Sequence, residues 1–338
     1  MDILRDADLK PFNTFGIAAK AEALGRFRDA DQLRTLLAAP ELAGMPRMIL
    51  GGGSNVLFTR DWPGAVLLNE VPGLDVVRED DDTVWLKAGA GVVWHDLVMH
   101  SVAKGWGGLE NMSLIPGKVG AAPMQNIGAY GVELKDTFEA LEALKVDDGS
   151  VVTFRKDDCR FGYRESYFKR EGRDRFVILN VTFRLSKRPV LNTSYGNIAQ
   201  ELAKRGITAP ALRDVSDAVI AIRSSKLPDP RVLGNAGSFF KNPVVPSALA
   251  DRIRAQYPDV SAYPAGEGQV KLAAGWLIEK AGWKGFREDG YGVHKDQALV
   301  LVNHGGATGQ NIFDLSTRIL ESVHERFGVE LEREVNII

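Results

Sequence analysis

The chain has 338 residues, 45% of them hydrophobic and 25% charged, with 42 lysines and arginines against 44 aspartates and glutamates. This composition is typical of globular proteins and excludes a fibrous or disordered chain, and the formal charge of −2 provides no overall positive field for nucleic acid. Glycine is in excess, because 35 of 338 residues is about 10%, against roughly 7% on average.

The length predicts two domains, because a single hydrophobic core stops growing beyond about 250 to 300 residues. The opening MDILRDADLK does not resemble a secretory signal, and no apolar run approaches the roughly 18 residues of a membrane helix. We therefore expect a cytoplasmic protein that does not bind membranes. Cys159 is the only cysteine, which excludes an intramolecular disulfide and a zinc site built from cysteines.

The first half of the chain combines short strands with few helices. Apolar runs and turn residues predict strands and hairpins, and a helical spacing of apolar residues ends in a glycine stop. A glycine-rich stretch covers 105–131. The predicted strands are 47–50, 65–70, 74–79 paired with 83–89, the hairpin 139–154 and 175–185, and the predicted helix is 92–105.

The second half is richer in helical spacing, which places a domain boundary near 207–215. We therefore predict an α+β protein with domains 1–210 and 211–338, the first divided into subdomains of about 1–70 and 71–210. The C-terminal strand is free to return to the first domain. The predicted helices are 195–206, 214–223, 247–257, 271–281 and 310–327, and the predicted strands are 297–303 and 329–338.

Several common sites are absent from the sequence. There is no G-x-G-x-x-G, no P-loop and no G-x-S-x-G, and the five histidines form no metal-binding pattern. These absences disfavour a Rossmann dinucleotide site, a P-loop enzyme, a serine hydrolase and a metal centre.

Two glycine-rich segments are candidates for ligand binding. In ILGGGSNVLF, at 49–58, three glycines after a strand can present backbone N–H groups to an oxyanion, although an ordinary tight turn is equally compatible. In LENMSLIPGKVGAAPMQNIGAYGVEL, at 109–134, small residues and amides suit backbone laid against a flat ring system. A buried structural loop is the alternative.

Two further segments carry candidate side chains. CRFGYRESYFK, at 159–169, places Arg164 among aromatic residues, where it is either a functional cation or a stacked or ion-paired core arginine. RSSKLPDPRVLGNAGSFFKNP, at 223–243, is locally basic and holds Ser238 in a tight glycine setting. Taken alone, such a segment is more often a surface loop than a site.

Together these segments resemble one family. The motifs NTFG (13–16), GGGSNVLF, IPGKVGAAPMQNIGAYG, CRFGYR, KLPDP, GNAGSFFKNP, VKLAAGWLI (270–278) and LEREV (331–335) occur in the order seen in UDP-N-acetylenolpyruvoylglucosamine reductases, also called UDP-N-acetylmuramate dehydrogenases. The resemblance covers about residues 10 to 335. SYGN, at 194–197, resembles the tyrosine loop of the longer, type I branch.

The resemblance implies a bipartite FAD-binding domain of the vanillyl-alcohol-oxidase (PCMH) type, followed by an α+β substrate-binding domain. The FAD would be non-covalent, and neither flavin segment contains a histidine. The positions matching the family's flavin-binding residues are Gly51, Gly53, Ser54, Asn55, Ile115, Pro116, Gly117, Gly120, Gln125, Asn126, Gly128, Ala129, Gly131 and Ile178.

The resemblance also implies the reaction. NADPH would reduce FAD, and a hydride would then pass to the vinyl carbon of UDP-N-acetylglucosamine enolpyruvate in peptidoglycan precursor synthesis. A carbanion conjugated with a carboxylate needs a stabilising cation and a proton donor. By motif match Arg164 is that cation, Ser238 is the general acid, and Glu334 is the third catalytic residue. The matching substrate positions are Tyr195, Lys226, Asn242, Tyr263, Lys271 and Gln297.

Three residues depart from the family pattern. Lys118 replaces a small or sulfur-bearing residue, Arg333 replaces a proline, and Asn336 replaces an arginine near the end of the chain. The resemblance implies a protein that acts on small molecules, as a monomer and without a metal. The alternatives are another FAD-dependent sugar or alcohol oxidoreductase of the same fold, and a nucleotide-sugar-binding protein without turnover.

Overall fold

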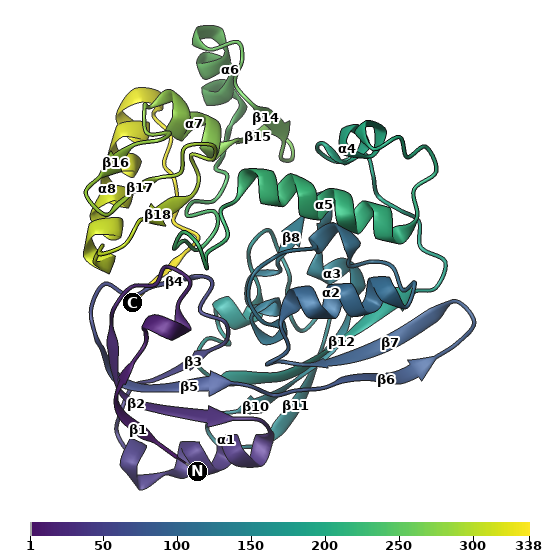
Figure 1. Ribbon diagram of the computed structural model, residues 1–338, viewed down its shortest axis with the longest axis vertical. Coiled ribbons are helices and arrows are strands. Elements are labelled where there is room, and N and C mark those ends of the chain that lie inside the picture. Colours follow the sequence, from purple (N-terminus) through teal and green to yellow (C-terminus); the bar gives the residue numbers. More distant parts are fainter. Residues whose placement is uncertain (1) are drawn as a thin grey trace. The chain divides into compact units, whose positions relative to one another are not determined.

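The structure is a computed structural model that describes residues 2–338, drawn as a ribbon in Figure 1. Its chain divides into two compact units. Unit 1 consists of Met1–Ala7, Ala21–Gly52 and Pro63–Ser225, and unit 2 of Asp8–Lys20, Gly53–Trp62 and Lys226–Ile338. The expected boundary near 207–215 thus lies within unit 1, because helix α5 (Leu212–Lys226) packs there, and two N-terminal segments belong with the C-terminal part.

The first sheet of unit 1 has the strand order β1-β2-β5-β3. Its strand β2 shows the exposed and buried alternation of a sheet with one face in the core, and β3 runs parallel to β5. Helix α1 begins after Asp29, whose side chain accepts a hydrogen bond from the Gln32 N–H. The elements are β1 Leu4–Asp8, β2 Lys20–Phe27, α1 Ala30–Ala38, β3 Arg47–Leu50 and β5 Trp62–Asn69.

The second sheet of unit 1 has the order β11-β10-β12-β7-β6, with antiparallel neighbours throughout. Both predicted hairpins are confirmed. Helix α2 buries Trp94 on this sheet, where its ring lies 5.8 Å from that of Phe183. The elements are β6 Leu74–Glu79, β7 Thr83–Gly89, α2 Trp94–Ala103, β8 Gly128–Ala129, β9 Val132–Glu133, α3 Leu134–Thr137, β10 Phe138–Lys145, β11 Val151–Arg155 and β12 Phe176–Ser186.

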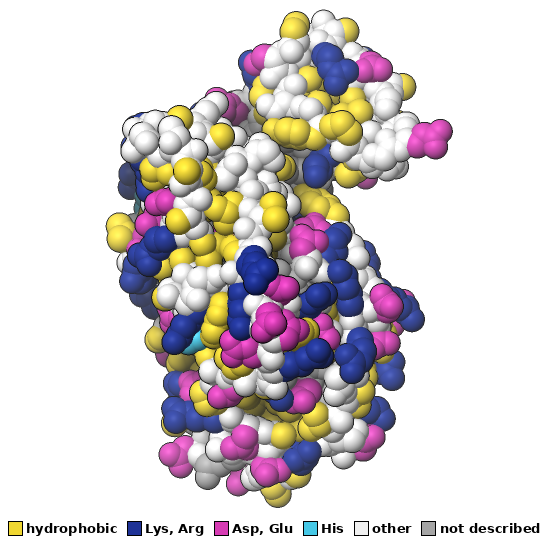
Figure 2. Space-filling model, turned by 90° about the vertical axis from the view of Figure 1, so that its right-hand side faces the viewer, with side chains coloured by type: hydrophobic (Ala, Val, Ile, Leu, Met, Phe, Trp, Pro, Cys, Tyr) yellow, Lys and Arg dark blue, Asp and Glu magenta, His cyan; other side chains and the backbone are white. Residues whose placement is uncertain are grey.

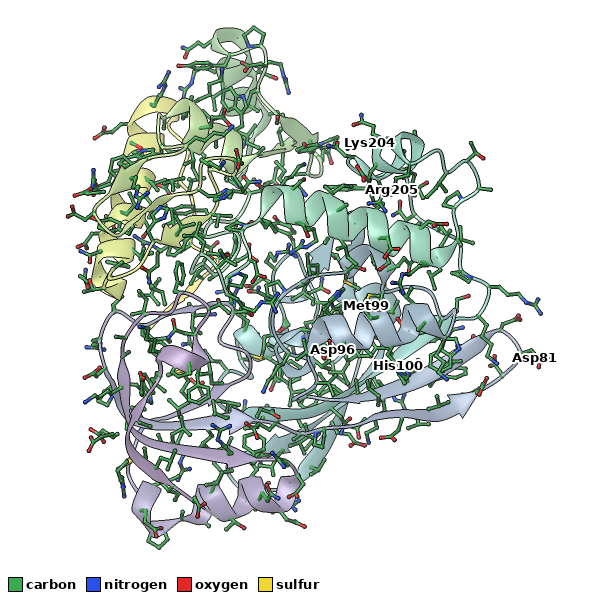
Figure 3. All side chains as sticks on the ribbon, in the orientation of Figure 1. Asp81, Asp96, Met99, His100, Lys204 and Arg205 are labelled. Carbon is green, nitrogen blue, oxygen red and sulfur yellow. The ribbon has the colours of Figure 1, made fainter. Side chains whose placement is uncertain are left out.

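Helices α4 (Ile198–Lys204) and α5 complete unit 1. They share a small apolar cluster that includes Ile198, Leu202 and Val219. Figure 3 labels Met99 on α2, whose sulfur accepts a hydrogen bond from the Ser216 hydroxyl of α5 at 3.8 Å. Hydrophobic residues of α4 and α5 thus form a core of their own, and a polar contact ties α5 to α2.

Unit 2 contains two three-stranded sheets, β13-β15-β14 and β16-β17-β18, and a parallel pair of β4 and β19. Helix α8 begins at a capping box made by Thr308 and Asn311 and ends at Gly328, whose φ is +68°. The elements are β4 Val56–Leu57, β13 Val244–Pro246, α6 Ser247–Gln256, β14 Ala262–Pro264, β15 Gln269–Leu272, α7 Ala274–Lys280, β16 Arg287–Glu288, β17 Tyr291–Val293, β18 Leu301–Asn303, α8 Gly309–Phe327 and β19 Asn336–Ile337.

Two predictions for unit 2 need correction. The helix predicted for 271–281 begins only at Ala274, because Gln269–Leu272 pairs with both neighbouring strands as β15. The strand predicted for 329–338 is reduced to Asn336–Ile337, preceded by a single bridge between Arg333 and Phe240. The predicted α+β class is confirmed, and the two sheets of unit 1 fall within the predicted subdomains of about 1–70 and 71–210.

Six single turns of 3-10 helix lie between these elements. They are Lys10–Phe12, Pro40–Leu42, Glu110–Met112, Val119–Ala121, Pro123–Gln125 and Tyr167–Lys169.

The surface carries charges of both signs. Figure 2 shows acidic and basic side chains interspersed on the face it presents. Some charges of opposite sign pair directly, as Lys187 does with Glu79, the last residue of β6, at 2.6 Å. Across residues 2–338, no helix has the length and hydrophobicity needed to cross a membrane. The same residues contain no cluster of three or more His, Cys, Asp or Glu arranged to hold a metal ion.

Candidate active site

In unit 1, two glycine segments from distant parts of the sequence touch. A Cβ on Gly52 would lie 3.1 Å from the Cα of Gly117. Within residues 2–338, the backbone N–H groups of Gly51, Gly52, Gly117 and Lys118 donate to no backbone carbonyl. Buried or half-buried N–H groups normally find an acceptor. Open donors on two adjoining backbone segments are therefore a suitable cradle for an anionic group.

Lys118 adds a positive charge to this cradle. Its Cβ lies 3.6 Å from the place of a Cβ on Gly51, and its ammonium group donates to the Asn69 carbonyl at 3.0 Å. Burial lowers the pKa of Lys118, and the Glu70 carboxylate partly opposes this effect. The departure from the family pattern thus places a partly desolvated cation beside the open N–H groups.

Close packing explains the remaining glycines of the long segment. A Cβ on Gly120 would lie 2.6 Å from the Cβ of Ala90, and one on Gly128 would lie 2.7 Å from the Val132 carbonyl oxygen. Gly131 has a φ of +79°, which L-residues rarely adopt. Glycines in 115–131 thus allow the backbone to lie close to neighbouring atoms. This agrees with the prediction that small residues in this segment leave the backbone accessible.

Asn126 ties this segment to the turn that carries Arg164. Asn126 is fully buried, and its side-chain amide donates to the Gly162 carbonyl and to the Glu133 carboxylate, at 3.0 and 3.1 Å. Its amide oxygen accepts from the Lys135 N–H at 3.1 Å. Because the protein uses both amide hydrogens, any hydrogen bond that Asn126 donates to a ligand would have to come from its main chain.

Arg164 is held in an uncommon backbone conformation. Its φ is +55°, and a hydrogen-bonded turn from Gly162 to Glu165 surrounds it. Its guanidinium donates to the Gly128 carbonyl at 3.1 Å and lies 5.5 Å from the ring centre of Tyr163. The predicted catalytic cation is therefore attached to the predicted flavin segment within unit 1.

A second cation lies in the same region of unit 1. The Nε of Arg223 donates to the Leu114 carbonyl at 3.3 Å. Burial lowers the pKa of Arg223, Tyr130 opposes this effect, and the charge of Arg164 adds to it. Arg223 is the last residue of the predicted helix 214–223 and the first of the basic segment 223–243, and neither pattern indicated that its guanidinium is buried.

In unit 2, the end of the first glycine segment is fixed by steric contact. Gly53 has a φ of +60°, and a Cβ there would lie 1.9 Å from the Phe12 carbonyl oxygen. The Thr14 N–H donates to the Gly53 carbonyl at 3.1 Å. Ser54 and Asn55 follow directly and lead into β4, so NTFG and GGGSN form one local structure.

Ser238 lies on an extended segment of unit 2 between two others. It forms a bridge with Val300, and the next residue, Phe239, donates its N–H to the Leu299 carbonyl at 2.8 Å. Gly237, before it, has a φ of +70° and donates to the Asn235 side chain at 2.9 Å. The glycine setting therefore turns the chain so that Ser238 is half-buried beside two buried phenylalanines.

Glu334 lies on the segment along the other edge. Its N–H donates to the Phe239 carbonyl at 2.8 Å, and the Asn55 side chain donates to the Glu334 carbonyl at 3.2 Å. Asn336 donates to the Asn55 carbonyl from both its backbone and its side chain, at 3.1 and 2.9 Å. Two of the three predicted catalytic residues, Ser238 and Glu334, are thus on neighbouring backbone segments, and Asn336 serves this arrangement.

Arg333 points from this segment into α8. It donates to the hydroxyls of Ser316 and Thr317 at 2.7 and 2.6 Å, and its guanidinium lies 4.5 Å from the ring centre of Phe313. The arginine that replaces the family's proline therefore anchors the backbone segment that carries Glu334 to α8.

Four predicted substrate residues gather around the junction of β15 and α7. Tyr263 and Lys271 are directly paired on neighbouring strands. Asn242 accepts a hydrogen bond from the Ala274 N–H at the start of α7 at 3.0 Å, and the Gln297 amide oxygen lies 3.2 Å from the place of a Cβ on Gly275. Residues separated by more than 50 positions in sequence thus lie at one end of unit 2.

The other predicted positions are distributed as follows. Tyr195 in unit 1 and Lys226, the last residue of α5, are exposed. Ile178 is buried in β12 and accepts a hydrogen bond through its carbonyl from Asn69 at 2.8 Å. Ile115, Pro116, Gln125 and Ala129 lie in the same unit 1 segment as the glycines described above.

Comparison with known families first defines the class. Residues 21–155 match the FAD binding domain family, and residues 229–338 match the C-terminal domain of UDP-N-acetylenolpyruvoylglucosamine reductase. The protein is therefore a flavoprotein of the oxidoreductase class. The open N–H groups fit the pyrophosphate of FAD, because successive backbone N–H groups form an anion-binding concavity. The Lys118 ammonium group adds a positive charge nearby.

Comparison with individual proteins then gives the family. The chain is 52% identical over 337 residues to UDP-N-acetylenolpyruvoylglucosamine reductase of Pseudomonas aeruginosa, covering 100% of this chain and 99% of the relative. It is 54% identical over 336 residues to that of Burkholderia vietnamiensis, covering 99% and 96%. The crystal structure of the Thermus caldophilus enzyme shares the fold, with a TM-score of 0.68 at 23% identity over 99% of this chain and 98% of that one. The chain belongs to the UDP-N-acetylenolpyruvoylglucosamine reductase family.

Proposed function

We propose that the protein reduces UDP-N-acetylglucosamine enolpyruvate to UDP-N-acetylmuramate, with NADPH as the electron donor and non-covalently bound FAD as the carrier. This reaction belongs to peptidoglycan precursor synthesis in the cytoplasm, and we propose that the protein performs it as a monomer. The observation that supports it most is that Ser238 and Glu334 lie on neighbouring backbone segments of unit 2, which are joined by the hydrogen bond from the Glu334 N–H to the Phe239 carbonyl. An enzyme that protonates a carbanion needs such a donor in a fixed place.

When bound, FAD would accept a hydride from NADPH and deliver one to the vinyl CH₂ of the enolpyruvyl ether. The open N–H groups of Gly51, Gly52 and Gly117, with Lys118, would hold its pyrophosphate. Arg164 would stabilise the negative charge that develops on the substrate carboxylate. Its tether to the Gly128 carbonyl limits its movement, so less reorganisation is needed when the charge appears.

Ser238 would donate its hydroxyl proton to the carbon next to the carboxylate. One hydride and one proton then saturate the vinyl group, and the serine alkoxide recovers a proton from solvent. Glu334 would hold the substrate carboxylate or orient a cation. The nucleotide sugar would be bound by side chains of unit 2, namely Lys226, Asn242, Tyr263, Lys271 and Gln297, and lysine suits a diphosphate. Tyr195 would be a further contact.

The alternatives receive less support. The match of residues 229–338 to a reductase C-terminal domain argues against another FAD-dependent sugar or alcohol oxidoreductase of the same fold. A binding protein without turnover would have no use for Arg164 in a left-handed backbone conformation, which carries a cost in stability.

Anaerobic NADPH oxidation with and without UDP-N-acetylglucosamine enolpyruvate tests the proposal. We expect oxidation to depend on that compound, and oxidation at the same steady rate without it would contradict the assignment. In Ser238→Ala, NADPH should still reduce the flavin at nearly the normal rate, while substrate reduction should fall by about 10² to 10⁴. Ser247→Ala, at the start of α6, serves as the control and should retain both half-reactions.

A further inference from the structure

Asn111 is a buried side chain that joins two loops of unit 1. It lies in the turn Glu110–Met112 and is fully buried. Its amide nitrogen donates to the Tyr130 carbonyl at 3.0 Å and to the Asn192 carbonyl at 2.9 Å. The amide cannot be reversed, because its oxygen would then face two carbonyl oxygens. Each of its two amide hydrogens therefore holds a different loop.

The two loops touch each other as well. We call Gly128–Gly131 the flavin turn and 189–197 the Tyr195 loop. A Cβ on Gly131 would lie 3.1 Å from the Asn192 amide nitrogen and 3.2 Å from the Tyr195 Cβ. A Cβ on Gly196 would lie 3.6 Å from the Tyr130 ring. A side chain of each loop thus packs on a glycine of the other.

Both loops rest on the same apolar support. Tyr130 from the flavin turn and Leu191 from the Tyr195 loop pack against the cluster that includes Ile198, Leu202 and Val219 of α4 and α5. Arg164, the proposed catalytic cation, donates to the Gly128 carbonyl at the other end of the flavin turn. A shift of the flavin turn would therefore be transmitted both to Arg164 and to the Tyr195 loop.

Packing alone does not explain an asparagine at position 111. Its amide oxygen is buried without a hydrogen-bond partner among residues 2–338. A buried acceptor without a partner costs about 1 to 3 kcal/mol. An asparagine is needed here because only a side chain with two N–H groups can bind both carbonyls at once.

We propose that Asn111 is a positioning residue that couples the flavin turn to the Tyr195 loop, so that FAD and the nucleotide sugar bind with positive cooperativity. This inference rests on the proposed function, which assigns ligands to the two loops. FAD bound at the flavin turn would limit the movement of the Tyr130 carbonyl. Through its hydrogen bonds to Tyr130 and Asn192, Asn111 would then also limit the movement of the Tyr195 loop, so that Tyr195 is already placed when the nucleotide binds. Such coupling is reciprocal, so the nucleotide sugar must retain FAD to the same degree.

The test is the release of FAD from the holoenzyme with and without saturating UDP-N-acetylmuramate, in the absence of NADPH. Flavin fluorescence on dilution gives the Kd of FAD in each case. In the wild type we expect the nucleotide to lower this Kd by about fivefold or more, the lower range of typical coupling between sites. In Asn111→Ala the ratio of the two Kd values should fall below about twofold.

Ser216→Ala is the matched control. Ser216 is also fully buried in unit 1, and its hydroxyl lies 2.8 Å from that of Ser113 rather than on either loop. This variant should lose thermal stability but keep the wild-type ratio of FAD Kd values. If Ser216→Ala loses the ratio as Asn111→Ala does, the coupling reflects general stability and the inference is wrong.

A wild-type measurement covers the case in which Asn111→Ala fails to fold. Chymotrypsin should cleave after Tyr195, which is 51% exposed, and FAD should slow this cleavage at least about fivefold. Equal rates at saturating and substoichiometric FAD would overturn the inference. If both ligands bind and the wild-type FAD Kd is the same with and without UDP-N-acetylmuramate, the inference is wrong but the proposed function stands. A protein that binds neither FAD nor the nucleotide contradicts the proposed function itself.

Discussion

The two units differ in the kind of group found at their predicted binding positions: backbone in unit 1 and side chains in unit 2. In unit 1 the cofactor positions are mostly backbone, with open N–H groups at Gly51, Gly52 and Gly117 and close contacts that exclude a Cβ. In unit 2 the substrate positions are side chains, such as Lys271 and Tyr263, placed by strand pairing. A backbone site depends on the absence of side chains, so substitutions there act through steric exclusion. A side-chain site depends on single groups, so substitutions there remove one interaction.

The largest expected effect comes from substituting glycines of unit 1, which have two different roles: Gly120 allows close packing, and Gly51 is proposed to bind FAD. Gly120→Ala would place a Cβ 2.6 Å from that of Ala90, so we expect a loss of about 1 to 3 kcal/mol or more in the free energy of unfolding, even without FAD. In Gly51→Ala the new Cβ would lie 3.6 Å from the Lys118 Cβ, an ordinary contact. This variant should keep the stability of the apoprotein and lose FAD affinity.

Chemical denaturation and flavin titration of the two variants measure these effects. If Gly51→Ala bound FAD as tightly as the wild type, the glycine segment would be a packing feature and not a ligand cradle.

The next effect tests the side-chain site of unit 2. Lys271→Met should raise the KM for the nucleotide sugar by about tenfold to a hundredfold, because a hydrogen bond to a charged group contributes about 1.5 to 3 kcal/mol. The FAD content should not change. Lys280→Met is the control, because Lys280 also loses a charge but pairs with Asp259 at 2.9 Å on an exposed surface. An unchanged KM in Lys271→Met would remove this residue from the proposed site.

The sequence predicted the second sheet of unit 1 well for a physical reason, whereas β1, β2 and α1 of the first sheet were not predicted. The hairpins at 74–89 and 139–154 have local turns between alternating strands, so their pairing follows from neighbouring residues. The family motifs also identified the segments around Gly51, Arg164 and Ser238. A motif is contiguous in sequence, so it can mark such a segment but not the distant residues that it meets.

The remaining features depend on contacts between distant residues. No sequence pattern indicated that Gly53 contacts Phe12, or that the Asn55 side chain donates to the backbone carbonyl of Glu334. Asn111 was part of a quoted motif, but its two loop contacts require the fold. The helix predicted for 271–281 was wrong at its start because helical spacing of apolar residues continued into β15. Tertiary pairing overrides local periodicity in such short strands.

A further effect concerns the anchor of the backbone segment that carries Glu334. Arg333→Ala should lower the free energy of unfolding by about 1 to 3 kcal/mol, because two hydrogen bonds from a charged group to α8 are lost. The kcat should fall less than in Ser238→Ala. Arg287→Ala, at an exposed position of β16, is the control for removing a positive charge and should stay close to the wild type. Equal stability of both variants would mean that Arg333 does not anchor this strand.

The smallest expected effect is a pH dependence in unit 1. The Nδ1 of His95 accepts a hydrogen bond from the N–H of Leu114 at 3.0 Å, just before the flavin segment. Burial lowers the pKa of His95, with Asp96 opposing and Arg223 adding to this effect. Above pH 6.5, the ordinary pKa of histidine, His95 is neutral in the folded and unfolded chain and contributes no pH dependence. As the pH falls below that value, the unfolded chain binds the proton first, so stability decreases until the folded pKa is passed.

A single proton gives a slope of at most about 1.4 kcal/mol per pH unit. His95→Gln removes the titrating group, so the difference in unfolding free energy between wild type and variant should be constant above pH 7 and shift in favour of the variant at lower pH. Denaturation curves from pH 8 down to pH 5 measure this difference, with the values at pH 8 as the internal reference. A difference that does not change with pH would show that the neutral imidazole is not needed to hold Leu114. A shift in the predicted direction would show that even a backbone-built site in unit 1 depends on the protonation of one side chain.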